Sequence, residues 1–96
     1  MSIVKIISKE NIKDLKFTSK EVLLDKESRE KRMRNLLRGL ALGNVLHGKV
    51  KITFETEDAK LYLVDTTIWA VSQEFINLKG NITIPVNAIL GLDLKY

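Results

Sequence analysis

The 96-residue sequence has no cysteine, one proline and one histidine. The absence of cysteine excludes disulfides, thiolate metal ligands and thiol nucleophiles, and it fits a reducing compartment. No apolar run approaches the roughly 18 residues that a membrane-spanning helix needs. The first seven residues are also too poor in apolar side chains for a signal peptide. We therefore expect a cytoplasmic protein without a membrane partner.

The residue types that usually carry catalysis are equally sparse. His47, the single histidine, has no serine or acid at a spacing that suggests a catalytic triad, and without cysteine it does not suggest a transition-metal site. The glycines match neither GxGxxG nor GxxxxGK[ST], the two common phosphate-loop patterns. Glu55, Glu57 and Asp58 cluster at a predicted turn, where acids usually keep a loop solvated. We expect no enzymatic activity, no catalytic residue, no metal site, no cofactor and no small-molecule substrate.

Composition predicts a single domain, residues 1–96. A chain that is 45% hydrophobic and 29% charged is ordinary for one that buries one core, and no repeat or proline-rich linker divides it. We expect an N-terminal arm over residues 1–25, a basic amphipathic helix over 26–43 and a small β-barrel over 48–96. A chain this short has a small interior, which favours self-association.

The helix is predicted by apolar residues at i, i+3, i+4 and i+7, the spacing that lines one helical face. These residues are Met33, Leu36, Leu37 and Leu40. Asp25 is the expected N-cap, with Ser28 as the alternative, because either side chain can accept from a free amide of the first turn. Gly43-Asn44 is expected to end the helix.

After Gly48 the apolar period changes from 3.6 to 2, which indicates strands. Five strands are expected, at 49–55, 60–72, 75–78, 82–84 and 89–94, with one tight turn at 86–88. The run 60–72 is apolar on both faces, so it must be covered twice or bend at a bulge. Trp69 lies within this run and is expected in the core. Before the helix, 3–7 indicates a strand or arm, and the residues around Ile12 indicate a helical turn.

The layout from Arg34 to Leu94 resembles the SH3-like and Sm-like small β-barrels. Shared features are the helix ahead of the barrel, the long bent second strand and the single turn before the last strand. The resemblance implies an α+β, mainly β fold: a helix followed by a compact five-stranded antiparallel barrel. Sm proteins bind RNA through turns bearing Asp and Asn, whereas 72–74 reads Ser-Gln-Glu and 86–88 offers only Asn87, so that RNA site is not carried over. The segments 31–36 and 66–70 together are also similar to a family of small bacterial proteins, a resemblance that implies no activity.

The positive functional signal is charge. Residues 1–50 hold 12 Lys or Arg against 6 Asp or Glu, while residues 51–96 hold 4 against 6. Five cations gather within ten helix positions: Arg29, Lys31, Arg32, Arg34 and Arg38. Lys31, Arg34 and Arg38 share one face, and pairing with Glu27 and Glu30 four residues before Lys31 and Arg34 supports the helix.

Two functions follow, and the sequence leaves both open. The first is a binding or regulatory module that contacts RNA, single-stranded DNA or an acidic protein through the basic helix, which requires Arg32, Arg34 and Arg38 to be exposed. The second is homo-oligomeric assembly through an edge strand, either 3–7 or 89–94. The simpler alternative to the first is a solvated helix face, partly neutralised by Glu27 and Glu30.

Overall fold

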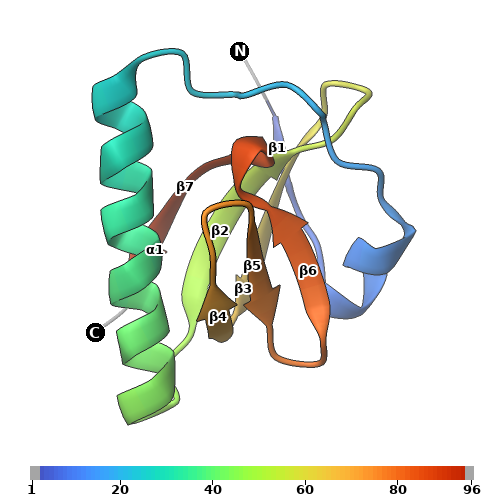
Figure 1. The fold of residues 1–96 in the computed structure, drawn as a ribbon. Coiled ribbons are helices and arrows are strands. Elements are labelled where there is room, and N and C mark those ends of the chain that lie inside the picture. The colour runs from blue at the N-terminus through green and yellow to red at the C-terminus, as the bar shows by residue number, and fades with distance from the viewer. Residues whose placement is uncertain (1–2, 95–96) are drawn as a thin grey trace.

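The computed structural model describes residues 3–94, and in this range one long helix lies beside two β-sheets (Figure 1). Helix α1 spans Lys26–Leu46, and two 3₁₀ helices are present, η1 (Lys9–Asp14) and η2 (Val86–Ala88). The strands are β1 (Val4–Ile6), β2 (Val50–Glu55), β3 (Leu61–Thr66), β4 (Ile68–Val71), β5 (Phe75–Leu78), β6 (Ile82–Pro85) and β7 (Ile89–Leu94). The fold is α+β and mainly β, as predicted. The outer ends of the predicted arm and barrel, 1–2 and 95–96, lie outside the described residues.

The strands form a four-stranded sheet in the order β1-β3-β2-β7 and a three-stranded sheet in the order β4-β5-β6. All neighbours are antiparallel except β1 and β3, which are parallel. The predicted strand 60–72 divides at Thr67, where the chain leaves one sheet for the other, and a bulge follows between Ile68 and Ala70. Strand pairing does not join the two sheets within residues 3–94, so the expected closed five-stranded barrel is not formed.

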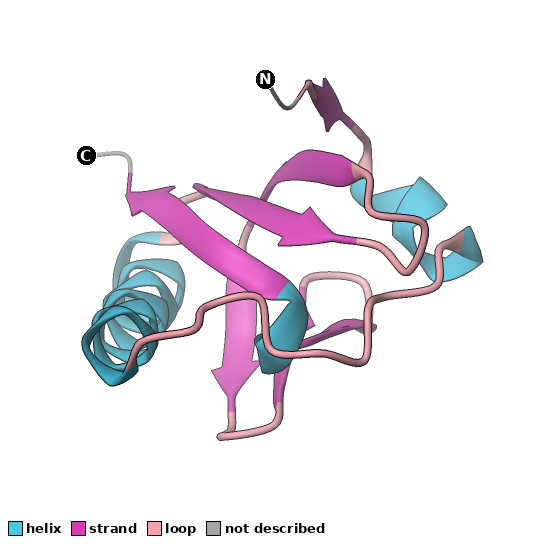
Figure 2. Ribbon diagram, turned by 90° about the horizontal axis from the view of Figure 1, so that it is seen from above, coloured by secondary structure: helices cyan, strands magenta, loops and turns pink. Residues whose placement is uncertain are grey.

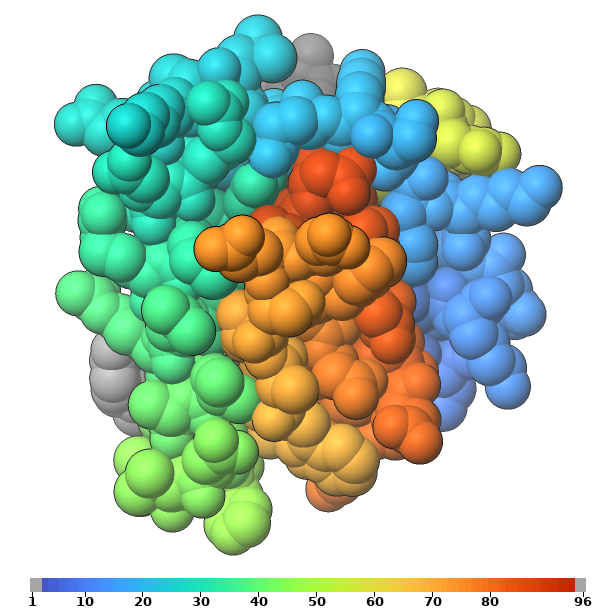
Figure 3. Space-filling view, viewed as in Figure 1, coloured from blue at the N-terminus to red at the C-terminus, as the bar shows by residue number. Residues whose placement is uncertain are grey.

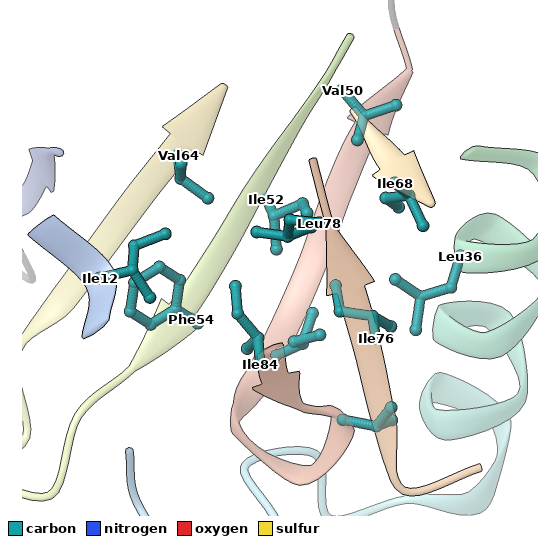
Figure 4. Packing of buried hydrophobic residues seen from close by; sticks show 12 residues of the cluster. Ile12, Leu36, Val50, Ile52, Phe54, Val64, Ile68, Ile76, Leu78 and Ile84 are labelled. Atoms are coloured by element: carbon teal, nitrogen blue, oxygen red, sulfur yellow. The ribbon is translucent and has the colours of Figure 1, made fainter. Parts of the chain in front are cut away.

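The core lies between the two sheets (Figure 4). Val50, Ile52 and Phe54 of β2 are fully buried, as their alternation predicts. They meet apolar residues of the three-stranded sheet, Ile76, Leu78 and Ile84 among them. The ring of Phe54 packs edge-on against Phe17 at 5.3 Å and stacks on Tyr62 at 5.8 Å. Burying one such side chain stabilises a fold by about 1.5–3 kcal/mol.

Helix α1 begins as predicted and ends later than predicted. Asp25 Oδ2 accepts a hydrogen bond from the Ser28 amide at 2.9 Å, which makes Asp25 the N-cap. The helix passes through Gly43-Asn44 and ends at Leu46, so the predicted bounds 26–43 are three residues short. His47 forms the C-cap in the left-handed conformation, with φ 53°, and its N–H donates to the Gly43 carbonyl at 3.1 Å.

Two glycines explain which face α1 buries. The buried residues of α1 are Arg32, Leu36, Gly39 and Gly43, whereas Leu37 of the predicted face is 50% exposed. A Cβ at Gly43 would lie 2.6 Å from the Ile68 carbonyl oxygen, and one at Gly39 would lie 3.0 Å from Ile68 Cδ1. The two glycines therefore allow α1 to approach the backbone of β4 closely.

Residues 3–25 pack against the two sheets, a question that the sequence left open. Strand β1 adds to β3, and Ile12 of η1 is fully buried. The segment after η1 crosses above both sheets to reach α1 (Figures 1 and 2). The Asn87 amide nitrogen donates to the carbonyls of Thr18 and Lys20, at 2.9 Å each, and fixes this crossing. The side-chain amide of Asn87 therefore uses both of its N–H donors within the protein.

Candidate nucleic-acid interface

Arg32 is a structural residue, which contradicts its predicted exposure. Its side chain is 6% exposed because it lies on the same helix face as Leu36. The guanidinium donates to both carboxylate oxygens of Glu21, with Nη2–Oε1 at 2.6 Å and Nη1–Oε2 at 2.7 Å. Nη1 also donates to the Ile89 carbonyl at 2.9 Å. Bidentate pairs of this kind are the stronger charge-assisted hydrogen bonds, so Arg32 is not available to a ligand.

The contact with Arg32 also determines the charge state of Glu21. The hydrogen bond from Arg32 lowers the pKa of the Glu21 carboxyl below its ordinary value, although partial burial acts in the opposite direction. The Leu23 amide also donates to Glu21 Oε2, at 3.0 Å. Glu21 is therefore held as a carboxylate.

Arg29 is engaged as well. Its Nη1 donates to the carbonyls of Leu23 and Leu24, at 3.0 and 2.9 Å, in the segment that leads into α1. Two of the five predicted site residues thus hold the chain ahead of the helix. This role was not predictable from the helical pattern, because the partners of Arg29 and Arg32 all lie outside the helix.

Lys31, Arg34 and Arg38 remain as an exposed group, which we call the α1 stripe. All three side chains are exposed, and none forms an ion pair or a side-chain hydrogen bond with residues 3–94. The predicted pairs of Glu27 with Lys31 and of Glu30 with Arg34 do not form; Glu30 instead lies 3.8 Å from Lys26. The stripe therefore keeps its positive charge free for a partner.

One member of the stripe, Lys31, borders a groove of about 450 Å³ between α1 and β7, and Arg34 and Arg38 lie outside its lining. Lys31 lines the groove on the helix side, and Asp93 lines it on the strand side. Gly91 leaves its centre open, because a Cβ there would meet no atom within 4 Å. Since β7 is the edge strand of its sheet, this groove follows the predicted edge at 89–94. The other predicted edge, 3–7, contains β1, which is paired with β3 of the same chain.

A second cationic group, missed by the sequence analysis, surrounds a groove of about 240 Å³ at the opposite end of the sheets from the crossing segment. Lys9, Lys49 and Lys79 line it, together with the acids Glu10 and Asp65. The three lysines come from η1, the α1–β2 loop and the β5–β6 turn. Only the fold brings them together, so no local pattern could have predicted the group.

Two aromatic rings are half-exposed on the three-stranded sheet. Trp69 of β4 is 50% exposed and Phe75 of β5 is 48% exposed. The expectation that Trp69 lies in the core is wrong, because the bulge between Ile68 and Ala70 interrupts the alternation that would have turned it inward. Tyr62 packs on Phe54, so it is not a free surface ring.

The acids of the β2–β3 hairpin interact with their neighbours. Asp58 accepts a hydrogen bond from the Thr56 hydroxyl, which lowers the pKa of the Asp58 carboxyl, and it also lies 3.6 Å from Lys60. Among residues 3–94, no three potential metal ligands gather in one place.

No family model, curated protein or solved structure matches this chain. None of the helices described between residues 3 and 94 has the length and apolarity to cross a membrane. The interface is therefore interpreted from its own geometry and charge.

Proposed function

We propose that the protein is a non-enzymatic nucleic-acid-binding module whose α1 stripe contacts the phosphate backbone. The supporting observation is that Lys31, Arg34 and Arg38 stay exposed and find no partner among residues 3–94, although Glu27 and Glu30 lie on the same helix. At 1.5 Å of rise per residue, the stripe extends over about 10 Å of helix axis. Two of its three members are arginines, whose planar guanidinium suits bidentate contacts with phosphate.

The strand order favours an opened version of the SH3-like and Sm-like plan. The protein has a helix ahead of the strands and the short turn η2 before the last strand. The consecutive strands β3 and β4, which lie in different sheets, take the place of the long bent strand. We propose that binding in this variant falls to α1 and not to the turns between strands. In support of this, the Asn87 amide is already engaged by Thr18 and Lys20.

A small number of phosphate contacts predicts moderate affinity and a moderate dependence on salt. The net charge of the whole chain is only +4, so long-range attraction is mild. Each neutralised phosphate contributes about 0.7 to the slope of log affinity against log salt for a single strand, and about 0.9 for a duplex. Three contacts therefore predict a slope of about −2 to −3.

The test is the fluorescence anisotropy of labelled 20-nucleotide RNA and DNA titrated with the protein at low and at physiological salt. We expect saturable binding that weakens as salt rises. A fluorescent poly-glutamate peptide is titrated in parallel. Binding of the peptide without binding of either nucleic acid assigns the stripe to an acidic protein and overturns the proposal; the absence of nucleic-acid binding at low salt also overturns it.

A further inference from the structure

A bulge in β4 turns two consecutive side chains outward. Ile68 pairs with Leu78 and Ala70 pairs with Asn77, so Trp69 is the additional residue between two registered pairs. In a regular strand one of two neighbours would face the core, but Trp69 and Ala70 are both exposed. The bulge therefore places an indole ring at the outer side of the three-stranded sheet.

A hollow of about 270 Å³ lies on the same side, next to this bulge. Phe75 and Asn77 of β5 line it, with Ala70 and Val71 of β4 and Thr83 of β6. No helix described in residues 3–94 covers this sheet face, which lies beside α1 at the front of the molecule (Figures 1 and 3). The hollow thus combines an aromatic wall with a polar residue from the middle of the sheet.

The polar residue of this hollow is unsatisfied. Asn77 Oδ1 is buried and has no hydrogen-bond partner among the described residues. A buried oxygen without a donor destabilises a fold, so each such group in a native protein calls for an explanation. This oxygen is closed to solvent in its present rotamer, and rotation of the side-chain amide would turn it into the hollow, where an N–H on the edge of a planar ring would donate to it.

We infer that this hollow binds a nucleobase and that the ligand of the protein is therefore single-stranded. The inference rests on the proposed function, since the α1 stripe supplies the backbone contacts while Phe75, which lines the hollow, supplies the stacking surface. Every base has a π-face that can stack on an aromatic side chain, whereas a duplex keeps its bases paired and stacked inside. Lys31 borders β7 whereas Phe75 lies on the three-stranded sheet, so a single strand that contacts both must pass over α1, which packs against both β4 and β7. Glu74, exposed beside Phe75, opposes the attraction and limits it.

The experiment compares the affinities of a labelled 12-nucleotide single strand and of a 12-base-pair duplex for the parent and three variants. Phe75→Ala removes the aromatic wall, and Asn77→Leu removes the unpaired oxygen. Leu24→Ala, which truncates an apolar side chain that is 89% exposed outside the hollow, is the matched control. Stacking of one base corresponds to about fivefold or more in affinity.

We expect the parent to prefer the single strand, Phe75→Ala and Asn77→Leu to weaken that binding at least fivefold, and Leu24→Ala to leave it unchanged. Duplex binding stays the same in all four proteins. The melting temperature of Asn77→Leu is equal to or above that of the parent, which separates lost binding from lost folding. Equal affinity of the parent for strand and duplex, or full single-strand affinity in both hollow variants, overturns the inference and leaves the proposed function standing. Failure of the parent to bind either nucleic acid overturns the proposed function and the inference that rests on it.

Discussion

The guanidinium of Arg32 holds the carboxylate of Glu21 at 2.6 and 2.7 Å and reaches the carbonyl of Ile89 at 2.9 Å with the same side chain. This contact ties α1 to the segment before it and to the first residue of β7. A residue that the sequence places in a basic patch is thus a crosslink between three parts of the fold. Arg32 is therefore a structural residue, whereas Arg34 and Arg38 of the same helix are exposed.

Replacement of Arg32 by alanine is predicted to destabilise the protein by about 1–3 kcal/mol, because the Ile89 carbonyl and the partly exposed carboxylate of Glu21 lose their partner. Arg34→Ala, at an exposed position on the same helix, is predicted to change the free energy of unfolding by less than about 0.5 kcal/mol. Urea unfolding followed by far-UV circular dichroism measures both. Similar stabilities of the two variants would show that the pair does not support the fold.

The Glu21–Arg32 pair also predicts how stability depends on pH. The pKa of Glu21 is lower in the folded protein than its ordinary value of 4.5, because Arg32 donates to it. The unfolded chain therefore binds a proton more readily, and the stabilisation is fully present above about pH 4.5 and is lost as the pH falls through the folded pKa. Denaturant unfolding between pH 7 and pH 3 should show a shallower decline in Glu21→Gln than in the parent, with a residual decline from Asp25 and Asp58, whose pKa values are also lowered. An identical decline in both proteins would exclude Glu21 as a source.

Much of the secondary structure was predictable because its signals are local. The alternation at 50–55, the tight turn at 86–88 and the N-cap at Asp25 each depend on a few neighbouring residues, and the structure confirms them. The doubly apolar run 60–72 left double coverage and a bend at a bulge as alternatives, and the structure has the bend with the bulge. The parallel pairing of β1 with β3 was not predictable, since its partners are more than 50 residues apart.

The parts that sequence reasoning missed depend on tertiary contacts. Gly43 looks like a helix terminator until the Ile68 carbonyl is found against it. Arg32 looks like a surface cation until Glu21 is found beside it. Of the three arginines predicted to be exposed, Arg34 and Arg38 are exposed and Arg32 is buried. The outward turn of Trp69 requires knowledge of the bulge.

The two helix glycines offer a matched pair of substitutions. Gly43→Ala is predicted to destabilise the protein by about 1–3 kcal/mol, because its Cβ would meet a backbone oxygen of β4 that cannot move aside. Gly39→Ala meets only the end of the Ile68 side chain, and alanine gains about 0.5–1 kcal/mol over glycine within a helix, so this variant should be close to neutral. Thermal unfolding of both variants measures the difference. If Gly43→Ala were as stable as Gly39→Ala, close approach of α1 to β4 would not be the reason for glycine at position 43.

The most direct measurement is the salt dependence of single-strand affinity in two triple variants that lose the same charge. One carries Lys31→Gln, Arg34→Gln and Arg38→Gln, and the other carries Lys5→Gln, Lys13→Gln and Lys16→Gln, three exposed lysines outside α1. Anisotropy titrations of a labelled oligonucleotide over a range of salt concentrations give the affinity and the slope for each. We predict that the α1 variant keeps its melting temperature, loses at least tenfold in affinity and has a slope shallower by about 2, while the control variant stays close to the parent. Equal losses in the two variants, or no loss in the α1 variant, would contradict the assignment of the interface to Lys31, Arg34 and Arg38.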